Sequence, residues 1–594
     1  MAIDVADLRA RQLDPAIERE IDTYEGHLEE YLRGDLDDDV FRVIRLTNGI
    51  YGQRQGGHNQ MVRIKVPAGR VTPEQLEMIG HLATRYSRGW AHLTTRQNAQ
   101  MHFVRLEDTP EVMRLLASVG LTTREACGDT VRNVMGCHLA GACPNEVLDI
   151  SAWAQATTDH FLRNPLSQRL PRKFKINFSG CAVDCGQAMF NDVGVVAVSR
   201  PRDDGTTEAG FRIFVAGGLG ANPHPAQALE DFTSREDLMP TIEAALRVQD
   251  HHGNRDNKLR ARMKWLVDTM GMDELRERIR KERRFLKASA TWPGGVPARV
   301  VANGDEPAGT GGDLENVPGM TPVTISSSDP YRRWEQANVV RGRANGTVSA
   351  YAYARLGDIT TEQFDQLADL QRDLGLDIRI TNRQNFALRD LAEDDLPVLH
   401  QRLVDMEMAE PGAELARDVV SCPGADTCNL AVTQSRGLAD DIGTALDDAG
   451  LADVGGVRIN ISGCTNSCGQ HHISDIGFFG LEKRAHGRSA PGYQMLLGGH
   501  LGDTEVEFGK RAAKLPAKSA SQAVVRIVGR YNEEREPGEA FPSWLQRSGG
   551  PGGVGETLSD LTEFPDPGEN PDFYTDFHET GPYVAETGDS ECAT

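Results

Sequence analysis

The sequence predicts an α+β protein built from two related halves. Residues 71–103 and 359–388 share a helix signature followed by a strand that ends in Thr-x-Arg-Gln-Asn, about 287 residues apart. Each half also contains a Cys-x5-Cys pair followed by a Cys-x3-Cys pair. Solenoid repeats are far shorter than this, so the pattern indicates a gene duplication with pseudo-twofold symmetry. We expect the functional site to lie where the two halves meet.

Length and charge limit the classes of protein that this chain can belong to. With 594 residues it is long enough for three or four domains. No apolar run approaches the roughly 20 residues of a membrane-spanning helix, and the first thirty residues lack a secretory pattern. The net charge of −23 disfavours nucleic acid as a partner, because such binding needs a basic face. We therefore predict a cytoplasmic protein that binds neither membranes nor nucleic acid.

The repeated helices carry the same start signal. Thr72, Pro73 and Gln75 fit the N-cap, N1 and N3 positions of a helix, and Thr360 with Gln363 repeats the capping box. An alternating strand, a second strand and an amphipathic helix follow in each copy. Each copy is therefore predicted to form an α+β unit.

Four cysteines of the second half form a candidate metal centre on two separate loops. Glycine and serine flank them, as suits tight turns whose backbone N–H groups point at sulfur. Structural zinc sites usually pair cysteines two to four residues apart, so a five-residue gap favours an iron–sulfur cluster while leaving zinc as an alternative. The candidate ligands are Cys422, Cys428, Cys464 and Cys468.

These cysteine spacings, the Arg-Gln-Asn strands and Leu-Pro-Arg-Lys-Phe-Lys at residues 170–175 resemble the sirohaem sulfite and nitrite reductase family. The resemblance extends to about residue 545 and is nearest to the single-chain, ferredoxin-dependent sulfite reductases. It implies a [4Fe–4S] cluster on the second-half cysteines, with Cys468 bridging the cluster to sirohaem iron. A shared thiolate would couple the two groups electronically.

The resemblance also implies a basic pocket, because sirohaem carries eight carboxylates and the substrate is itself an anion. Arginine can hold an oxyanion through two hydrogen bonds, and lysine can supply protons. The positions that match the family's substrate-side residues are Arg96, Arg132, Lys173 and Lys175. The residues expected to bind sirohaem carboxylates are Arg54, Gln55 and Gln100.

The expected reaction is the six-electron reduction of sulfite to sulfide. Lys173 and Lys175 resemble the sulfite reductases, and nitrite reduction at the same site is the alternative. A noncatalytic polyferredoxin-like electron carrier and a zinc scaffold are more distant alternatives, since neither would need the basic pocket. No Gly-rich dinucleotide fingerprint lies between a strand and a helix, so the electrons are expected from ferredoxin or another donor protein.

The first half departs from the family by keeping its own four cysteines. The direct interpretation is a second [4Fe–4S] cluster, with relict thiols or a zinc site as alternatives. These cysteines are Cys137, Cys143, Cys181 and Cys185.

The positions of the second half that correspond to the basic pocket of the first half carry fewer basic residues. Arg383 and Arg417 repeat the two arginines of the first half, but the two lysines are replaced by Gly456 and Arg458. We therefore hypothesise that one active sirohaem remains and that a first-half cluster serves structure or electron relay.

The expected architecture is a ferredoxin-like unit followed by a sirohaem/iron–sulfur α/β domain, present twice. The tail has eleven carboxylates and no Lys or Arg, which predicts disorder or a segment draped over the surface. The predicted limits are residues 1–40 for an N-terminal helical segment, 41–120 and 331–409 for the ferredoxin-like units, 121–290 and 410–547 for the sirohaem/iron–sulfur domains, 291–330 for a linker, and 548–594 for the tail.

Overall fold

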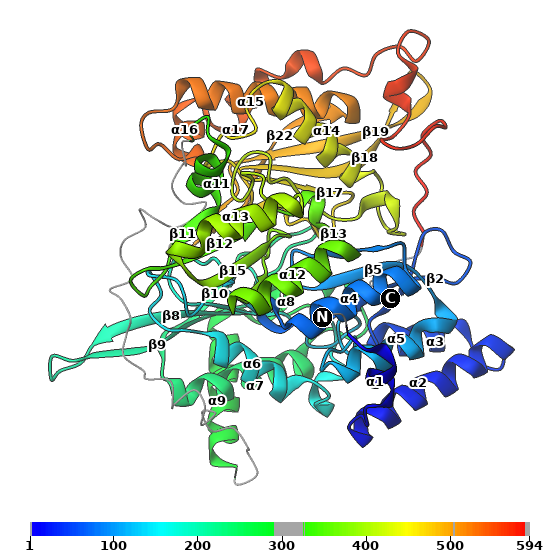
Figure 1. The fold of residues 1–594 in the computed structure, drawn as a ribbon, viewed down its shortest axis with the longest axis vertical. Coiled ribbons are helices and arrows are strands. Elements are labelled where there is room, and N and C mark those ends of the chain that lie inside the picture. Colours follow the sequence, from blue (N-terminus) through cyan, green and yellow to red (C-terminus); the bar gives the residue numbers. More distant parts are fainter. Residues whose placement is uncertain (1–2, 290–324, 326, 503–504, 589–594) are drawn as a thin grey trace.

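The computed structural model describes residues 3–289, 325, 327–502 and 505–588. The predicted linker, residues 291–330, lies outside the described residues except at 325 and 327–330. The structure is mixed α+β and consists of two similar halves stacked along the long axis of the molecule (Figure 1).

Two sheets form the middle of the molecule, and each borrows its last strand from the other half. The first sheet has the order β1-β2-β5-β4-β13 and the second β11-β12-β15-β14-β3. In β13, Asp358 pairs with His92 of β4, and in β3, Val71 pairs with Ile378 of β14. This exchange confirms the predicted pseudo-twofold relation. The strands are β1 Ile50–Gly52, β2 Asn59–Ile64, β3 Arg70–Val71, β4 Trp90–Leu93, β5 Ala99–Arg105, β11 Val339–Arg341, β12 Thr347–Ala352, β13 Asp358–Thr360, β14 Asp377–Ile380 and β15 Phe386–Ala392.

The helices α4 (Pro73–Tyr86) and α12 (Thr361–Leu374) lie side by side across the two exchanged sheets (Figure 1). Both predicted capping boxes are confirmed: each N-cap threonine accepts from the N3 backbone, and each N3 glutamine accepts from the N-cap backbone. Arg372 and Glu77 join the helices through contacts of 2.6 and 2.7 Å. Apolar side chains of both halves therefore share one core.

Two further sheets each begin with three parallel strands and continue antiparallel, in the orders β6-β7-β8-β9-β10 and β16-β17-β18-β19-β22. The parallel strands are where the cysteine loops start. The strands are β6 Met135–Gly136, β7 Ile176–Ser179, β8 Val193–Pro201, β9 Thr207–Val215, β10 Gln227–Thr233, β16 Val420–Ser421, β17 Ile459–Ser462, β18 Ile476–Ala485, β19 Arg488–Leu497 and β22 Lys510–Pro516, with a separate pair β20 His500–Leu501 and β21 Val506–Glu507.

The remaining helices cover these sheets. The longer ones bury an apolar face, and in α2 the side chain of Asp14 also caps the N-terminus. They are α1 Val5–Ala10, α2 Pro15–Arg33, α3 Asp38–Thr47, α5 Thr109–Ser118, α6 Ser151–Phe161, α7 Arg235–His252, α8 Lys264–Met270 and α9 Met272–Ala288 in the first half, and α11 Pro330–Asn338, α13 Leu396–Asp405, α14 Ser435–Asp448, α15 Ala520–Glu534, α16 Phe541–Arg547 and α17 Gly550–Glu556 in the second.

The C-terminal segment, residues 548–588, fits the draped alternative of the tail prediction rather than the disordered one. It forms α17 and then runs over the second half, where Tyr574, Phe577 and Tyr583 are buried. Tyr583 donates to the carbonyl of Val432 at 2.9 Å, beside the second-half cysteine loop. Its composition cannot build a core of its own, but these aromatic side chains insert into a core that already exists.

Helix length and polarity bear on membrane insertion. Among the described residues, every helix is too short or too polar to cross a lipid bilayer.

Candidate functional site

The second-half cysteines lie on two loops that leave neighbouring parallel strands. Cys422 follows β16 and Cys464 follows β17, and these strands pair in register at Val420 and Asn460. Parallel strands end at the same edge of a sheet, so the two loops meet there. Cys428 and Cys468 complete the set one turn further along each loop.

The four thiols perturb one another electrostatically. Burial, followed by the thiolate charge of Cys468, raises the pKa of Cys422, and the same causes raise the pKa of Cys464. The backbone N–H of Gly463 donates to the Cys422 sulfur at 3.3 Å. In the described part of the chain, no three His, Cys, Asp or Glu side chains converge on a single metal-ion position. A cubane is a larger body than zinc, which takes each sulfur at about 2.3 Å.

A turn of the first half reaches this cysteine loop. Thr95, between β4 and β5, donates from its hydroxyl to the carbonyl of Cys468 at 2.9 Å, and Gln470 donates back to the Thr95 carbonyl at 3.3 Å. Cys468 is the exposed member of its set, whereas Cys422, Cys428 and Cys464 are only partly accessible. The junction therefore presents one open thiol beside the first-half turn.

Arg96 follows Thr95 on that turn and points into the first half. Its guanidinium donates to the carbonyl of Asn133 at 2.7 Å and to the side-chain oxygen of Asn177 at 3.3 Å, both neutral acceptors. Its Nε has no hydrogen-bond partner among the described atoms. Burial, with the charge of Arg132 next, lowers the pKa of Arg96 to about 9. The guanidinium thus lies in an environment that already holds excess positive charge.

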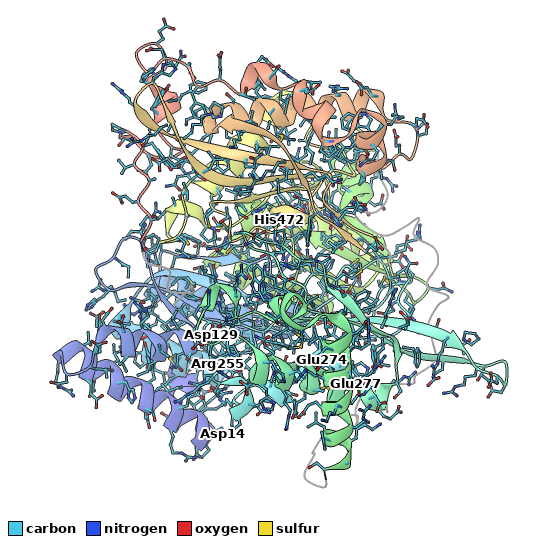
Figure 2. All side chains as sticks on the ribbon, turned by 180° about the vertical axis from the view of Figure 1, so that it is seen from behind. Asp14, Asp129, Arg255, Glu274, Glu277 and His472 are labelled. Atoms are coloured by element: carbon cyan, nitrogen blue, oxygen red, sulfur yellow. The ribbon has the colours of Figure 1, made fainter. Side chains whose placement is uncertain are left out.

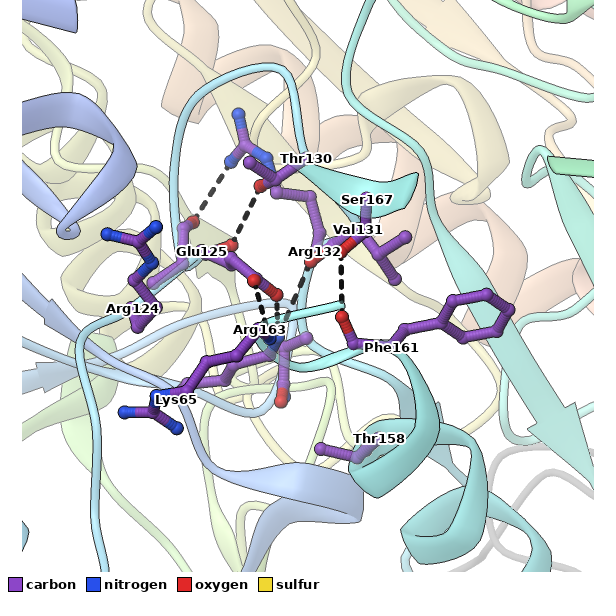
Figure 3. A network of polar contacts seen from close by, with 12 residues as sticks. Lys65, Arg124, Glu125, Thr130, Val131, Arg132, Thr158, Phe161, Arg163 and Ser167 are labelled. Carbon is purple, nitrogen blue, oxygen red and sulfur yellow. Dashed lines mark hydrogen bonds and ion pairs between the residues drawn. The ribbon is translucent and has the colours of Figure 1, made fainter. Parts of the chain in front are cut away.

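Arg132 is held by the loop that precedes β6. It donates to the carbonyls of Ala126 and Gly128 at 2.8–3.1 Å. Figure 3 shows the support of this loop: Lys65 lies 3.6 Å from the carboxylate of Glu125 and 3.4 Å from the carbonyl of Val131. These loop carbonyls help to position the Arg132 guanidinium.

Lys173 and Lys175 lead into β7 and are half-buried. Burial lowers the pKa of Lys175 well below its ordinary value, and the charges of Arg96, Arg262 and Lys173 lower it further. The four residues predicted for substrate binding are thus close enough to repel one another. A cationic cluster of this kind is stabilised by an anion.

The structure adds two cations that sequence reasoning missed. Arg262 and Lys264 are buried, and Arg262 pairs with Asp192 at 2.7 Å. Burial and the charge of Arg262 lower the pKa of Lys264 to about 8. Both residues precede or open the short helix α8, and no local motif marks them, because they reach the cluster only through the tertiary fold.

The predicted sirohaem ligands have protein partners in this structure. Arg54 donates to the carbonyls of Ala431 and Glu586, and Gln55 donates to the carbonyl of Asp426, so both lie against the second-half cysteine loop. The side-chain oxygen of Gln100 faces Arg63 at 2.5–2.7 Å. Arg54 and Gln55 thus lie beside the junction, whereas Gln100 contacts Arg63 of β2; the role of all three stays a prediction.

The pseudo-equivalent junction has the opposite character. There a cavity of about 30 Å³ lies among Cys185, His138, Tyr351, Arg383 and residues of the second half. Asn382 donates to the Cys185 carbonyl at 2.7 Å, as Thr95 does to Cys468. The two junctions therefore share one backbone arrangement.

Carboxylates neutralise this second pocket. Arg383 lies 2.9 Å from Asp418 and 3.4 Å from Glu414, and Arg458 lies 2.9 Å from Glu414. Burial opposes ionisation of Glu414, yet Arg458 and Arg383 keep its pKa below the ordinary value. Arg417 turns outward to Glu410, Asp447 and Asp453 at 2.7–3.3 Å.

The two halves contact each other behind this region as well. His472, labelled in Figure 2 where the upper and lower halves meet, has its Nε2 3.0 Å from the Gly220 carbonyl. Burial lowers the pKa of His472 to about 4. A neutral imidazole therefore joins the halves near the clustered cations.

Comparisons with known proteins agree with this duplicated arrangement. The family model described as "Nitrite and sulphite reductase 4Fe-4S domain" matches residues 127–285 and again 412–551. The model described as "Nitrite/Sulfite reductase ferredoxin-like half domain" matches residues 51–119 and 341–406. Each half of the chain thus contains one copy of each domain type.

Individual relatives extend over most of the chain. The assimilatory ferredoxin-dependent nitrite reductase of Haloferax mediterranei is 29% identical over 87% of this chain and 87% of its own length. Sulfite reductase [ferredoxin] 1 of Mycolicibacterium paratuberculosis is 28% identical over 84% of this chain and 87% of its own length. The structure of the Mycobacterium tuberculosis NirA protein superposes with a TM-score of 0.72 at 27% identity, covering 88% of this chain and 94% of that one. The chain belongs to the nitrite and sulfite reductase family of oxidoreductases with a 4Fe-4S domain.

Proposed function

We propose that this enzyme reduces sulfite to sulfide with six electrons, at a sirohaem coupled to a [4Fe–4S] cluster held by Cys422, Cys428, Cys464 and Cys468. The observation that carries the proposal is the junction itself. An exposed thiol, Cys468, hydrogen-bonds through its backbone to the turn that bears Arg96. The cation cluster of the first half lies behind that turn.

The donor set suits both groups. Two loops bring four cysteines together, and the Gly463 N–H points at one sulfur, as clusters require. The unpartnered Nε of Arg96 and the lowered pKa values of Arg96 and Lys175 indicate positive charge in excess of the one buried carboxylate, Asp192, that acts on both groups. The carboxylates of sirohaem and a bound oxyanion would supply the balancing negative charge. When bound, sirohaem supplies the redox-active iron at which the substrate is reduced.

The reaction needs protons as well as electrons: sulfite, six protons and six electrons give sulfide and three waters. Arg96 and Arg132 are fixed by neutral acceptors and present charged N–H groups that can orient the oxyanion. Lys175, whose pKa is lowered by burial and by neighbouring cations, holds a proton that it can transfer readily. Lys173 contributes a second ammonium beside it. These residues would protonate the oxygens that leave as water.

The electron donor that we propose is ferredoxin. Two of the relatives are named as ferredoxin-dependent enzymes. An acidic chain with a net charge of −23 would need a local basic area to dock an acidic partner. We place the reaction in the cytoplasm. We expect no nucleic acid partner, because the net negative charge of the chain disfavours binding to a polyanion.

Nitrite is the second candidate substrate, because named relatives include enzymes for each anion. Sulfite is favoured here by the paired Lys173 and Lys175, since a doubly charged anion gains more from two ammonium groups. The choice rests on a few contacts, and enzymes discriminate between similar substrates by such differences.

The test is the anaerobically purified protein with reduced ferredoxin or a reduced viologen as donor. We expect sirohaem absorption bands and a higher kcat/KM for sulfite than for nitrite. In Lys175→Asn that preference should shift toward nitrite. A protein without sirohaem bands would disprove the proposed centre, and a wild type that prefers nitrite would assign the alternative substrate.

A further inference from the structure

The first half contains a cysteine set that the proposed reaction does not use. Cys137 follows β6 and Cys181 follows β7, which are parallel neighbours in register at Gly136 and Phe178. The second-half loops start from the same pair of strands in their own sheet. Cys143 and Cys185 are the later cysteines of their pairs and correspond to Cys428 and Cys468 of the second half.

The four first-half thiols are brought together. Cys181 and Cys185 pack together with Val183, and Cys185 also packs against the buried cluster that contains Cys137 and Cys143. Cys137, Cys143 and Cys181 are 6–8% exposed, which shields them from solvent. Four cysteines gathered in this way form the ligand set that an iron–sulfur cluster needs.

The backbone of the first-half loops turns tightly after two of the cysteines. The Ala140 N–H donates to the Cys137 carbonyl at 3.1 Å, and the Asp184 N–H donates to the Cys181 carbonyl at 3.3 Å. In the second half, the Gly463 N–H of the matching loop donates to the Cys422 sulfur at 3.3 Å. A donor of this kind stabilises the sulfur charge of an iron–sulfur cluster.

The loops keep this shape through close backbone approaches. A Cβ added at Gly186 would lie 1.9 Å from the Phe178 carbonyl oxygen, and one added at Gly469 would lie 2.0 Å from that of Ile461. Only glycine fits at these two equivalent positions. The turn geometry of the cysteine loops is thus built equally in both halves.

Contacts from the second half close the first-half loop. Glu146 accepts from the Gly141 backbone at 2.8 Å and lies 3.4 Å from Arg343. The backbone of Arg343 donates to the Ala142 carbonyl at 2.8 Å. Arg379 donates to the Cys137 carbonyl at 3.5 Å. The second half therefore holds the first-half cysteine loop in place.

We propose that Cys137, Cys143, Cys181 and Cys185 hold a second [4Fe–4S] cluster that carries no sirohaem. The neighbouring cavity is lined by Arg383, Arg458 and Glu414. Its cations are already paired with Glu414 and Asp418. The pocket therefore lacks the excess positive charge that the carboxylates of a second sirohaem would need.

The first test counts metal in the wild-type protein, purified without oxygen. We expect about nine irons, about eight acid-labile sulfides and one extractable sirohaem per chain. About five irons with one sirohaem would overturn the second cluster while leaving the proposed function intact. About ten irons with two sirohaems, or zinc in place of four irons, would overturn it as well.

The second test removes two ligands from one loop, in the double variant Cys137→Ser/Cys143→Ser. We expect a loss of about four irons and about four sulfides, with the sirohaem bands unchanged. Cys127→Ser is the matched control, because Cys127 is also buried in the first half but lies outside the set and should keep all its iron. Unchanged iron in the double variant would contradict the proposal. If the double variant is insoluble, the wild-type count alone decides.

Discussion

The two junctions between the halves share one backbone arrangement but differ in charge. The pocket at the Cys468 junction is cationic, and the pocket at the Cys185 junction is neutralised by carboxylates. Thr95 touches the Cys468 loop on one side, and Asn382 touches the Cys185 loop on the other. On the first side the clustered cations lower the pKa of one another. On the second, carboxylates pair with each arginine. The backbone is shared, so a few side chains decide which junction accepts an anionic group.

Two positions that correspond between the halves account for much of the difference in charge between the two pockets. Asp418, which pairs with Arg383, corresponds to Asn133, whose side chain is neutral and donates to the Arg96 carbonyl. Glu414 corresponds to Asp129, which turns away to Arg172 and Lys258 and is labelled in Figure 2 in the lower half. Duplication therefore left two similar pockets, and the placement of carboxylates separated their roles.

The largest expected effect comes from removing a cysteine ligand on either side. Cys464→Ser should abolish sulfite reduction and sirohaem binding together, because both depend on the second-half cluster. Cys181→Ser, the matched variant, should lose iron but keep the sirohaem bands. Absorption spectra and iron counts check both. Loss of sirohaem in Cys181→Ser would show that the two centres are not separate.

The next effect tests the pocket arginines. Arg96→Ala should lower kcat by about 10²–10³, as for the loss of one oxyanion-stabilising donor. Arg417→Ala, in the other half, should keep kcat within about twofold, because its partners are surface carboxylates. Steady-state kinetics with sulfite provide the measurement. Equal losses in both variants would disprove the asymmetry between the halves.

Replacing Lys175 and replacing Arg458 should change the free energy of unfolding in opposite directions. Arg458→Met leaves Glu414 without one partner and should destabilise the cofactor-free chain by about 3 kcal/mol. Lys175→Met removes a cation that burial penalises and should stabilise it by about 0.5–2 kcal/mol. Urea midpoints at neutral pH give both values, and changes of the same sign would contradict the comparison.

The Lys175→Met gain should also depend on pH. The folded-state pKa of Lys175 is lowered from 10.5, so the folded chain releases this proton first as pH rises. The penalty on the wild type is therefore full at low pH and disappears as pH approaches 10.5. The stability difference between the variant and the wild type should shrink over that range.

The smallest effect is expected when the neutral Asn133 and the charged Asp418, which correspond between the halves, are each replaced by the residue of the other. Asn133→Asp places a carboxylate near Arg96 and should raise KM for sulfite about tenfold, roughly the effect of 1.4 kcal/mol. Asp418→Asn, the reverse change, should leave KM unaltered because it lies in the second pocket. An unchanged KM in Asn133→Asp would mean that net charge does not control the first pocket.

Local features of the fold could be predicted because neighbouring residues determine them. The capping boxes at Thr72 and Thr360 need only residues three positions apart. The cysteine spacing and the flanking glycines likewise indicated two equivalent loop pairs. Composition left the tail open between disorder and a draped segment because it describes an isolated segment, whereas Phe577 and Tyr583 are buried against a core supplied by other elements.

The sequence by itself determined the duplication, the α+β units, the cysteine sets and four of the clustered cations. Tertiary structure alone decided that β3 and β13 change sheets, that Arg262 and Lys264 join the cluster, and that Glu414 neutralises the second pocket. These contacts join residues far apart in the chain, so no local pattern records them. Charge acts through space, and only the folded chain sets the distances between its charges.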